Sequence, residues 1–209
     1  MTNLAIYKMN AKMEKEFWEK KWVDKETGWD IGYASPAIKF QFQTTSNHEV
    51  KILIPGCGNA HEAEEIYALG FKNVYVIDIS ETAVASFKKR CPHFPEDQII
   101  CGDFFTSNKL TEFGPFDFIV EQTFFCAINP ERREEYCERM AEILADSGSV
   151  VGLMFNFPLE TGPPFGGSRE EYVERFNKYF DSVEITDCKT SIEPRQDREF
   201  WIKLSDPKK

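Results

Sequence analysis

Two glycines with one residue between them, Gly56 and Gly58, follow the apolar stretch Val50–Pro55 and precede a segment with helical character. A glycine turn where a strand leads into a helix lets backbone amides approach a ligand closely at the open helix N-terminus. A G-x-G pattern by itself is a weak signal, because the same turn can also be a tight connection that binds nothing. This turn is a candidate binding site that needs support from other residues.

Two acidic residues follow the next apolar stretches and supply that support. Asp78 closes the run Val74–Ile77, 22 residues beyond Gly56, where a carboxylate can accept hydrogen bonds from both hydroxyls of a ribose. Asp103 and Phe104 close the following short apolar run and suit the amino group and the ring face of an adenine. Asp103 could instead cap a turn. Together the three positions predict an adenosine-binding site.

Other nucleotide-binding loops fit this sequence less well. In the G-x-G-x-x-G fingerprint of dinucleotide-binding proteins, counted from Gly56, the third glycine would fall at residue 61, which is His61. A bulky side chain there hinders the close packing of helix and strand that the fingerprint needs. No G-K-[ST] follows the glycines, so a phosphate-binding NTPase loop is disfavoured further.

The elements that must position these residues alternate between short apolar runs and helical segments, as in βαβ units. Strands are expected at Val50–Pro55, Val74–Ile79, Ile99–Cys101, Phe116–Glu121, Ser149–Phe155, Val183–Lys189 and Glu199–Leu204. Helices are expected at Ala60–Leu69, Thr82–Arg90, Arg132–Leu144 and Ser168–Phe180, with a short one around Ala37–Phe42. Because the last two strands are joined without a helical pattern, we expect them to be antiparallel. The fold class is a doubly wound α/β sheet.

An aromatic N-terminal segment precedes this core. Residues 11–23 place Met13, Phe17, Trp18 and Trp22 at helical or nearly helical spacings among Lys and Glu, which predicts an amphipathic helix lying on the domain. Trp29 follows in a loop beside Gly28. We expect residues 1–45 to form a helical cap and residues 50–204 a Rossmann-like core. The tryptophans either close over a ligand or simply dock the helix.

Composition limits the partners and the compartment. The 209 residues fit one domain spanning the whole chain, and 42% hydrophobic with 14% aromatic residues supplies an ample core. A net charge of −10 disfavours nucleic acid and anionic membrane surfaces. The six cysteines form no C-x-x-C pair, and neither a signal peptide nor a transmembrane stretch is visible. We expect a cytoplasmic protein, a monomer, without a bound metal.

The motifs together resemble the thiopurine S-methyltransferase superfamily, and within it the halide/thiol methyltransferase branch, over residues 14 to 204. The resemblance rests on six motifs of this sequence: Trp18-x3-Trp22-x6-Trp29-Asp30, Pro55-Gly56-Cys57-Gly58-Asn59-Ala60-His61-Glu62, Ile77-Asp78-Ile79-Ser80-Glu81-Thr82-Ala83, Gly102-Asp103-Phe104-Phe105, residues 116–128, and Gly162-Pro163-Pro164-Phe165.

The resemblance implies a class I methyltransferase fold: a seven-stranded, mostly parallel sheet with an antiparallel last strand. It implies S-adenosylmethionine as cofactor, with S-adenosylhomocysteine as product. The cofactor contacts that it implies are Trp18, Trp22, Trp29, Gly56, Asp78, Asp103, Phe104 and Gln122. Gln122 stands where plant halide enzymes usually have Tyr, and Gly166-Gly167 follow Phe165 where many members carry bulkier residues. Both departures concern the methyl acceptor.

The implied reaction is an in-line displacement that transfers a methyl group to a small soft nucleophile: a thiol, hydrosulfide or a halide. Candidates for the acceptor pocket are Gln122, Thr123, Phe124, Phe165 and Arg133, although no catalytic residue is assigned. Phe125 could line the pocket or belong to the core. Arg133, among glutamates, could instead be a solvated ion-pair partner. His61 could accept a proton from a thiol, or pack and hydrogen-bond near the loop.

Several functions remain open at this point. The acceptor could be a heterocyclic thiol of the thiopurine kind, or the protein could bind S-adenosylmethionine without catalysis. A nitrogen or oxygen methyltransferase is disfavoured, since the end of the fourth strand, Glu121-Gln122-Thr123-Phe124, lacks the Asn-Pro-Pro-Tyr-like motif of many N-methyltransferases. A nicotinamide-binding protein is the remaining alternative. The sequence does not fix the acceptor, the oligomeric state or the order of residues 1–13.

Overall fold

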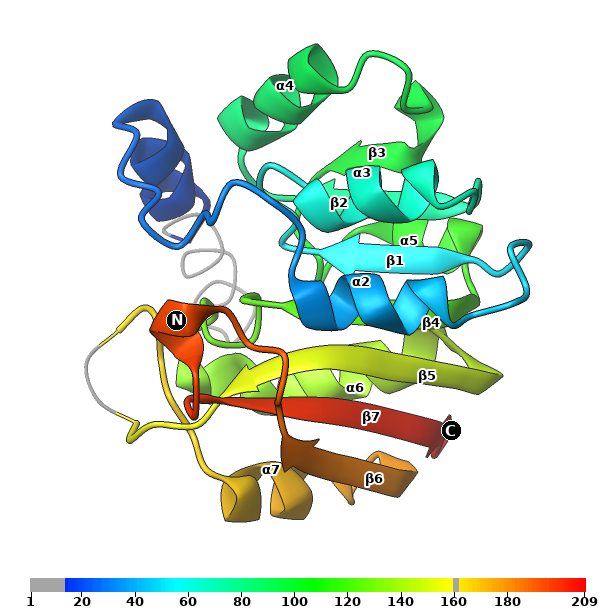
Figure 1. Ribbon diagram of the computed structural model, residues 1–209, viewed down its shortest axis with the longest axis vertical. Helices are drawn as coiled ribbons and strands as arrows, with labels where there is room; N and C mark the ends of the chain where they lie inside the picture. Colours follow the sequence, from blue (N-terminus) through cyan, green and yellow to red (C-terminus); the bar gives the residue numbers. More distant parts are fainter. Residues whose placement is uncertain (1–13, 160–161) are drawn as a thin grey trace, which may run out of the picture.

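The computed structural model describes residues 14–159 and 162–209. Its centre is a seven-stranded sheet with the strand order β3-β2-β1-β4-β5-β7-β6 (Figure 1). The strands are β1 (Ile52–Pro55), β2 (Val74–Asp78), β3 (Ile99–Cys101), β4 (Phe116–Gln122), β5 (Leu144–Phe155), β6 (Phe180–Asp187) and β7 (Glu199–Pro207). The expected doubly wound α/β class is confirmed.

Helices cover both faces of this sheet (Figure 1). One set comprises α2 (Pro36–Gln43), α3 (His61–Ala68) and α4 (Glu81–Arg90), and the other α5 (Asn108–Phe113), α6 (Arg133–Ile143) and α7 (Arg169–Phe176). Short 3-10 turns are η1 (Glu96–Gln98), η2 (Pro130–Arg132) and η3 (Glu193–Arg195). None of the helices within the described residues has the length and apolar character that crossing a membrane requires.

The two layers of helices rest on two separate hydrophobic cores. Side chains alternate along a strand, so Ile52 and Ile54 of β1 pack into the core under α2, α3 and α4, whereas Leu53 packs into the core under α5, α6 and α7. All of β1 is buried. A strand buried on both faces explains why the sequence shows a continuous apolar run there instead of an alternating one.

The strand order reverses between β1 and β4, and this reversal positions the site. β1 pairs in parallel with β2 on one side and with β4 on the other. Their connections leave in opposite directions, which opens a crevice at the carboxyl ends of the strands. The helix formed by residues 14–23 lies beyond this same edge of the sheet (blue in Figure 1). Residues 11–13 of the predicted helix lie outside the described residues.

The last two strands form the expected antiparallel pair. β7 is antiparallel both to β6 and to β5, with Ile202 opposite Gly152 on one side and Ile185 on the other. The connection between β6 and β7 contains η3 and returns to the edge where the parallel strands end. This hairpin therefore brings a late part of the sequence to the crevice.

Several elements differ from the sequence expectation. α7 ends at Phe176 instead of Phe180, and β6 begins at Phe180, three residues before the predicted start at Val183. α5 was not predicted, because Leu110 is its one buried side chain and no amphipathic period is visible. β5 begins at Leu144, five residues before the predicted start at Ser149, and α6 ends at Ile143. Leu144 pairs with Phe116 beside an irregularity in the pairing of β4 with β5. Asp146 and Ser147 within this part of β5 are exposed, and their polar side chains predict a turn instead of a strand.

Candidate active site

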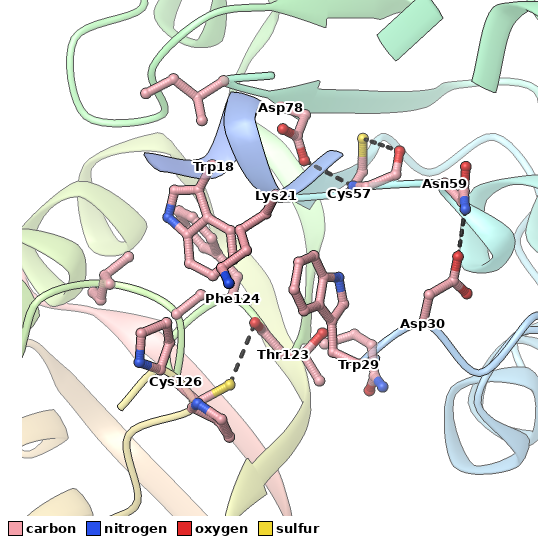
Figure 2. A pocket seen from close by; sticks show the side chains of 18 of the residues that line it. Trp18, Lys21, Trp29, Asp30, Cys57, Asn59, Asp78, Thr123, Phe124 and Cys126 are labelled. Carbon is pink, nitrogen blue, oxygen red and sulfur yellow. Dashed lines mark hydrogen bonds between the residues drawn. The ribbon is translucent and has the colours of Figure 1, made fainter. Parts of the chain in front are cut away.

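A cavity of about 810 Å³ lies at the carboxyl edge of the sheet, beneath the N-terminal segment. Its lining comes from the N-terminal segment, from the loops after β1, β2, β3, β4 and β5, and from the connection between β6 and β7. Figure 2 shows Trp18, Trp29, Asp78 and Phe124 around this space. Segments far apart in the sequence thus meet in one place.

The turn after β1 approaches other groups too closely for side chains. Gly56 and Gly58 both have positive φ angles, 58° and 52°. A Cβ atom on Gly56 would lie 2.3 Å from Cδ2 of Phe124, and one on Gly58 would lie 2.9 Å from Cζ2 of Trp22. The glycines are therefore required here by backbone conformation and by space. They form a cradle that holds the loop after β4 and the tryptophan cap close to the backbone.

Asp78 stands at the end of β2 with its carboxylate turned toward the glycine turn (Figure 2). It accepts hydrogen bonds from the backbone N–H groups of Gly58 and Ser80, each at 2.8 Å. Burial raises the pKa of Asp78, and these two backbone hydrogen bonds oppose that effect. Asp78 is thus a buried acceptor in the cavity wall, at the place that the sequence predicted for a ribose partner.

Asp103 and Phe104 line the cavity after β3. Asp103 accepts the N–H of Phe105 at 2.9 Å, so it caps a turn and also faces the cavity. Phe104 packs edge-on against Phe124, with 5.2 Å between ring centroids. The two alternatives considered for Asp103 are compatible, because the same side chain holds the turn and lines the cavity.

The three N-terminal tryptophans converge over the cavity. Trp29 contacts Trp18 and Trp22 edge-on, with ring centroids 5.4 and 6.0 Å apart. All three line the cavity. The helix that carries Trp18 and Trp22 is held to the core through Glu19, whose carboxylate accepts hydrogen bonds from Thr82 and from the Ser80 hydroxyl at 2.7 Å. The tryptophans therefore dock the helix and cover the cavity at once.

A polar cluster of Asp30, Asn59 and His61 joins this cap to the glycine turn, and of its members only His61 had a role predicted from the sequence. Asp30 accepts a hydrogen bond from the Asn59 side chain (Figure 2). It also accepts the Gly32 N–H at 2.8 Å and lies 2.9 Å from Nε2 of His61. Burial raises the pKa of Asp30, but these hydrogen bonds and the nearby imidazole outweigh it and hold the pKa below its usual value. His61 thus hydrogen-bonds beside the loop, one of its two predicted alternatives.

The loop after β4 is held in a rare conformation. Thr123 has a φ of 57°, which is uncommon for a β-branched residue. The buried carboxylate of Glu121 accepts the N–H groups of Phe124 and Phe125 at 2.8 and 2.9 Å and the Tyr136 hydroxyl at 2.6 Å. Burial raises the pKa of Glu121 to about 7. Glu121 thus holds the loop after β4. The sequence signal for this role, an acidic residue inside the apolar strand Phe116–Gln122, was missed.

Gln122 lines the cavity, and its amide oxygen Oε1 is buried without a hydrogen-bond partner in the described part of the chain. Native structures pair most buried polar atoms, so such an atom in a cavity wall points to a ligand donor. Thr123 and Phe124 line the cavity beside it.

Three candidates for the acceptor pocket do not line the cavity. Arg133 is 1% exposed, and its guanidinium bonds Glu171 and the Gly166 carbonyl, both at 2.8 Å. It is neither a solvated ion-pair partner nor part of the cavity lining. Phe125 packs against Tyr136 in the core. Phe165 does not line the cavity, although Gly162, Pro163 and Pro164 before it do.

The fold and this cavity define a class I S-adenosylmethionine-dependent methyltransferase. The glycine cradle, the acid at the end of β2 and the unpaired Gln122 oxygen fit an adenosyl cofactor with hydroxyl and amino donors. A crystal structure of 1,6-didemethyltoxoflavin-N1-methyltransferase from Burkholderia thailandensis with bound S-adenosylhomocysteine has the same fold. It superposes with a TM-score of 0.71 over 96% of this chain and 90% of that one, at 13% identity.

Within this class, the chain belongs to the thiopurine S-methyltransferase (TPMT) family, whose sequence profile matches residues 13–203. Probable thiol methyltransferase 2 of Arabidopsis thaliana is 32% identical over 196 residues, covering 90% of this chain and 85% of that protein. Thiocyanate methyltransferase 1 of the same plant is 33% identical over 161 residues, covering 75% and 68%. The predicted family, enzyme class and cofactor are confirmed.

Proposed function

We propose that this enzyme methylates a small soft nucleophile, such as a thiol, hydrosulfide or a halide. The proposal is supported by the likeness to relatives named as thiol and thiocyanate methyltransferases. Its main support is the chemistry of the cavity wall on the acceptor side, formed by the part of the chain after β4.

That side of the cavity offers no general base among the described lining residues. Its apolar residues are Phe124, Ala127, Ile128, Phe155, Phe157, Pro163, Pro164 and Pro194. Its other side chains are amide, hydroxyl, guanidinium and thiol groups, without a carboxylate or an imidazole. Burial raises the pKa of the Cys126 thiol, which keeps it protonated. An acceptor bound here must therefore already carry its reactive lone pair, as a thiolate, hydrosulfide or halide does near neutral pH.

Bound S-adenosylmethionine supplies a methyl group on a sulfonium sulfur, and the bonding electrons return to that sulfur when the nucleophile takes the methyl group. The chain itself has to bind, align and dry the reactants, since no strong acid is needed. Orientation can contribute several kcal/mol. The indole faces of the cap suit a cation, an attraction of about 0.5–2 kcal/mol. Cofactor contacts are proposed at Trp18, Trp22, Trp29, Gly56, Asp78, Asp103, Phe104 and Gln122.

Steady-state assays with S-adenosylmethionine and four acceptors test the proposal. We expect turnover of hydrosulfide, thiocyanate or iodide with a higher kcat/KM than that of 6-mercaptopurine. Higher kcat/KM with 6-mercaptopurine would assign the heterocyclic thiol class instead. Turnover of none of these compounds by folded protein that binds S-adenosylhomocysteine would overturn the proposal.

We further propose that the chain works as a monomeric, cytoplasmic, single-domain enzyme with a small-molecule acceptor and without nucleic acid, membrane or metal partners. The net charge of −10 supports the exclusion of polyanionic partners. Light scattering of the purified protein tests the oligomeric state, and a dimer would contradict it.

A further inference from the structure

The cap and the cofactor loop are joined at one carboxylate. Asp30 immediately follows Trp29, and its two oxygens divide their contacts: Oδ2 accepts the Asn59 side chain, and Oδ1 lies near both the Gly32 N–H and the His61 ring. Asn59 and His61 belong to the turn that begins with Gly56 and Gly58. Asp30 and His61 are largely buried, with side chains 16% and 17% exposed.

Trp29, which precedes Asp30, contacts both other tryptophans of the cap. Trp29 sits between Trp18 and Trp22 in edge-on contacts, and Trp22 in turn lies against Gly58. The Trp29 carbonyl accepts a hydrogen bond from Arg195 at 2.9 Å, which fixes its peptide to the connection between β6 and β7. That bond fixes the backbone on one side of Trp29. Asp30 supplies the attachment on the other side, toward the cofactor loop.

We infer that Asp30 is a positioning residue that sets the tryptophan cap over the cofactor site, through its hydrogen bonds to Asn59 and His61. The glycine turn and the cap then act as one unit in cofactor binding, since moving either one displaces the other. Asp30 lies in the cavity wall but needs no contact with the reacting atoms for this role. Its loss should weaken cofactor binding while leaving the acceptor's KM little changed.

An exchange of two residues tests the contact itself. In Asp30→Asn the new amide N–H₂ faces the Asn59 N–H₂, and two donors meet. In the double variant Asp30→Asn/Asn59→Asp, the donor and acceptor exchange places and the hydrogen bond is restored. The side-chain amide oxygen at position 30 can still accept hydrogen bonds from the Gly32 N–H and from the His61 ring. Asp24→Asn, which removes an exposed acid paired with Lys20 in the same segment, is the matched control.

Calorimetric titration with S-adenosylhomocysteine and quenching of tryptophan fluorescence are the direct measurements, alongside kcat and both KM values. We expect Asp30→Asn to bind S-adenosylhomocysteine about 10- to 100-fold more weakly, as for a lost hydrogen bond to a charged group. The double variant should recover most of the affinity, and Asp24→Asn should match the wild type.

A lower Tm for Asp30→Asn with unchanged affinity for S-adenosylhomocysteine would show a merely structural role and overturn the inference. So would a folded double variant that fails to recover affinity. If Asp30→Asn itself does not fold, Asn59→Ala removes the same hydrogen bond from the other side. Unchanged affinity in folded Asn59→Ala would then overturn the inference.

Discussion

At the scale of single residues, the glycine turn shows how closely the site is built. Gly56 allows the ring of Phe124 to lie against the backbone, where a Cβ atom would be 2.3 Å away. Glu121 holds Phe124 there by accepting its N–H, so a buried acid in β4 and a glycine just after β1 specify one position. Gly56 and Glu121 are connected through Phe124, whose ring packs against the one and whose N–H donates to the other.

Replacing Gly56 by alanine should strongly weaken cofactor binding. The added methyl group must displace Phe124, and the φ of 58° is unfavourable for alanine. Calorimetry should show S-adenosylhomocysteine affinity reduced by about 100-fold or more, equivalent to roughly 3 kcal/mol. Gly28→Ala is the control, because a Cβ there meets nothing within 4 Å. Equal affinities in the two variants would contradict this account of the turn.

The raised pKa of Glu121 predicts a pH dependence of stability. Its pKa is about 7 in the folded protein, above the ordinary value of about 4.5 for a glutamate, so the folded state holds the proton more tightly. The stability from this group is present below about pH 4.5 and is lost as pH rises through 7. Glu121→Gln keeps the hydrogen-bond geometry and does not titrate. Between pH 5 and 8, the free energy of unfolding of Glu121→Gln should therefore fall less than that of the wild type. The difference between the two falls should be about 3 kcal/mol at most. If the free energy of unfolding changed with pH equally in Glu121→Gln and in the wild type, this prediction would be wrong.

At the scale of elements, polar contacts attach the N-terminal helix to the core, among them the pairs Glu14–Arg132 and Lys15–Glu81. Glu19 connects residues 14–23 to the start of α4, through Ser80 and Thr82. The amphipathic pattern of this helix was visible in the sequence. Its attachment point was not, because a glutamate in a helix rich in Lys and Glu carries no distinguishing local signal.

Glu19→Ala should loosen this helix without unfolding the core. Losing hydrogen bonds to a charged group costs about 1.5–3 kcal/mol when they are buried and less when they are partly exposed, as here. Hydrogen exchange of residues 14–23, followed by mass spectrometry, should accelerate by roughly 5- to 10-fold. Glu26→Ala, which removes an exposed ion pair with Lys21, should leave the exchange unchanged. Similar acceleration in both variants would show that Glu19 is not the attachment.

At the scale of the whole molecule, the cofactor joins parts of the chain that the fold brings to one edge. A ligand that binds the folded state alone stabilises it by about 2.7 kcal/mol at 100 times its Kd. For a chain of this length, S-adenosylhomocysteine at that concentration should raise Tm by roughly 5–10 °C. NAD at the same concentration should not, because His61 stands at the third position of the glycine fingerprint. A comparable shift with NAD would contradict the assignment of this site.

Most of the fold could be predicted, since strands buried on both faces and amphipathic helices leave local periods in the sequence. The start of β5 and the existence of α5 could not, because Leu144 pairs across an irregular ladder and Leu110 alone is buried in its helix. The strand order was not predicted, since no local pattern specifies which strands pair; it comes from the structure.

The sequence by itself determined the chemistry of this protein: the glycine turn, the acids after β2 and β3, and the tryptophans form a specific set of motifs. Only the tertiary structure decided which side chains share a contact. It turned Arg133 into the core toward Glu171, and it joined Asp30 to Asn59 and His61. The physical reason is that residue type and short-range spacing are local properties, whereas partners depend on how distant segments pack around a common core.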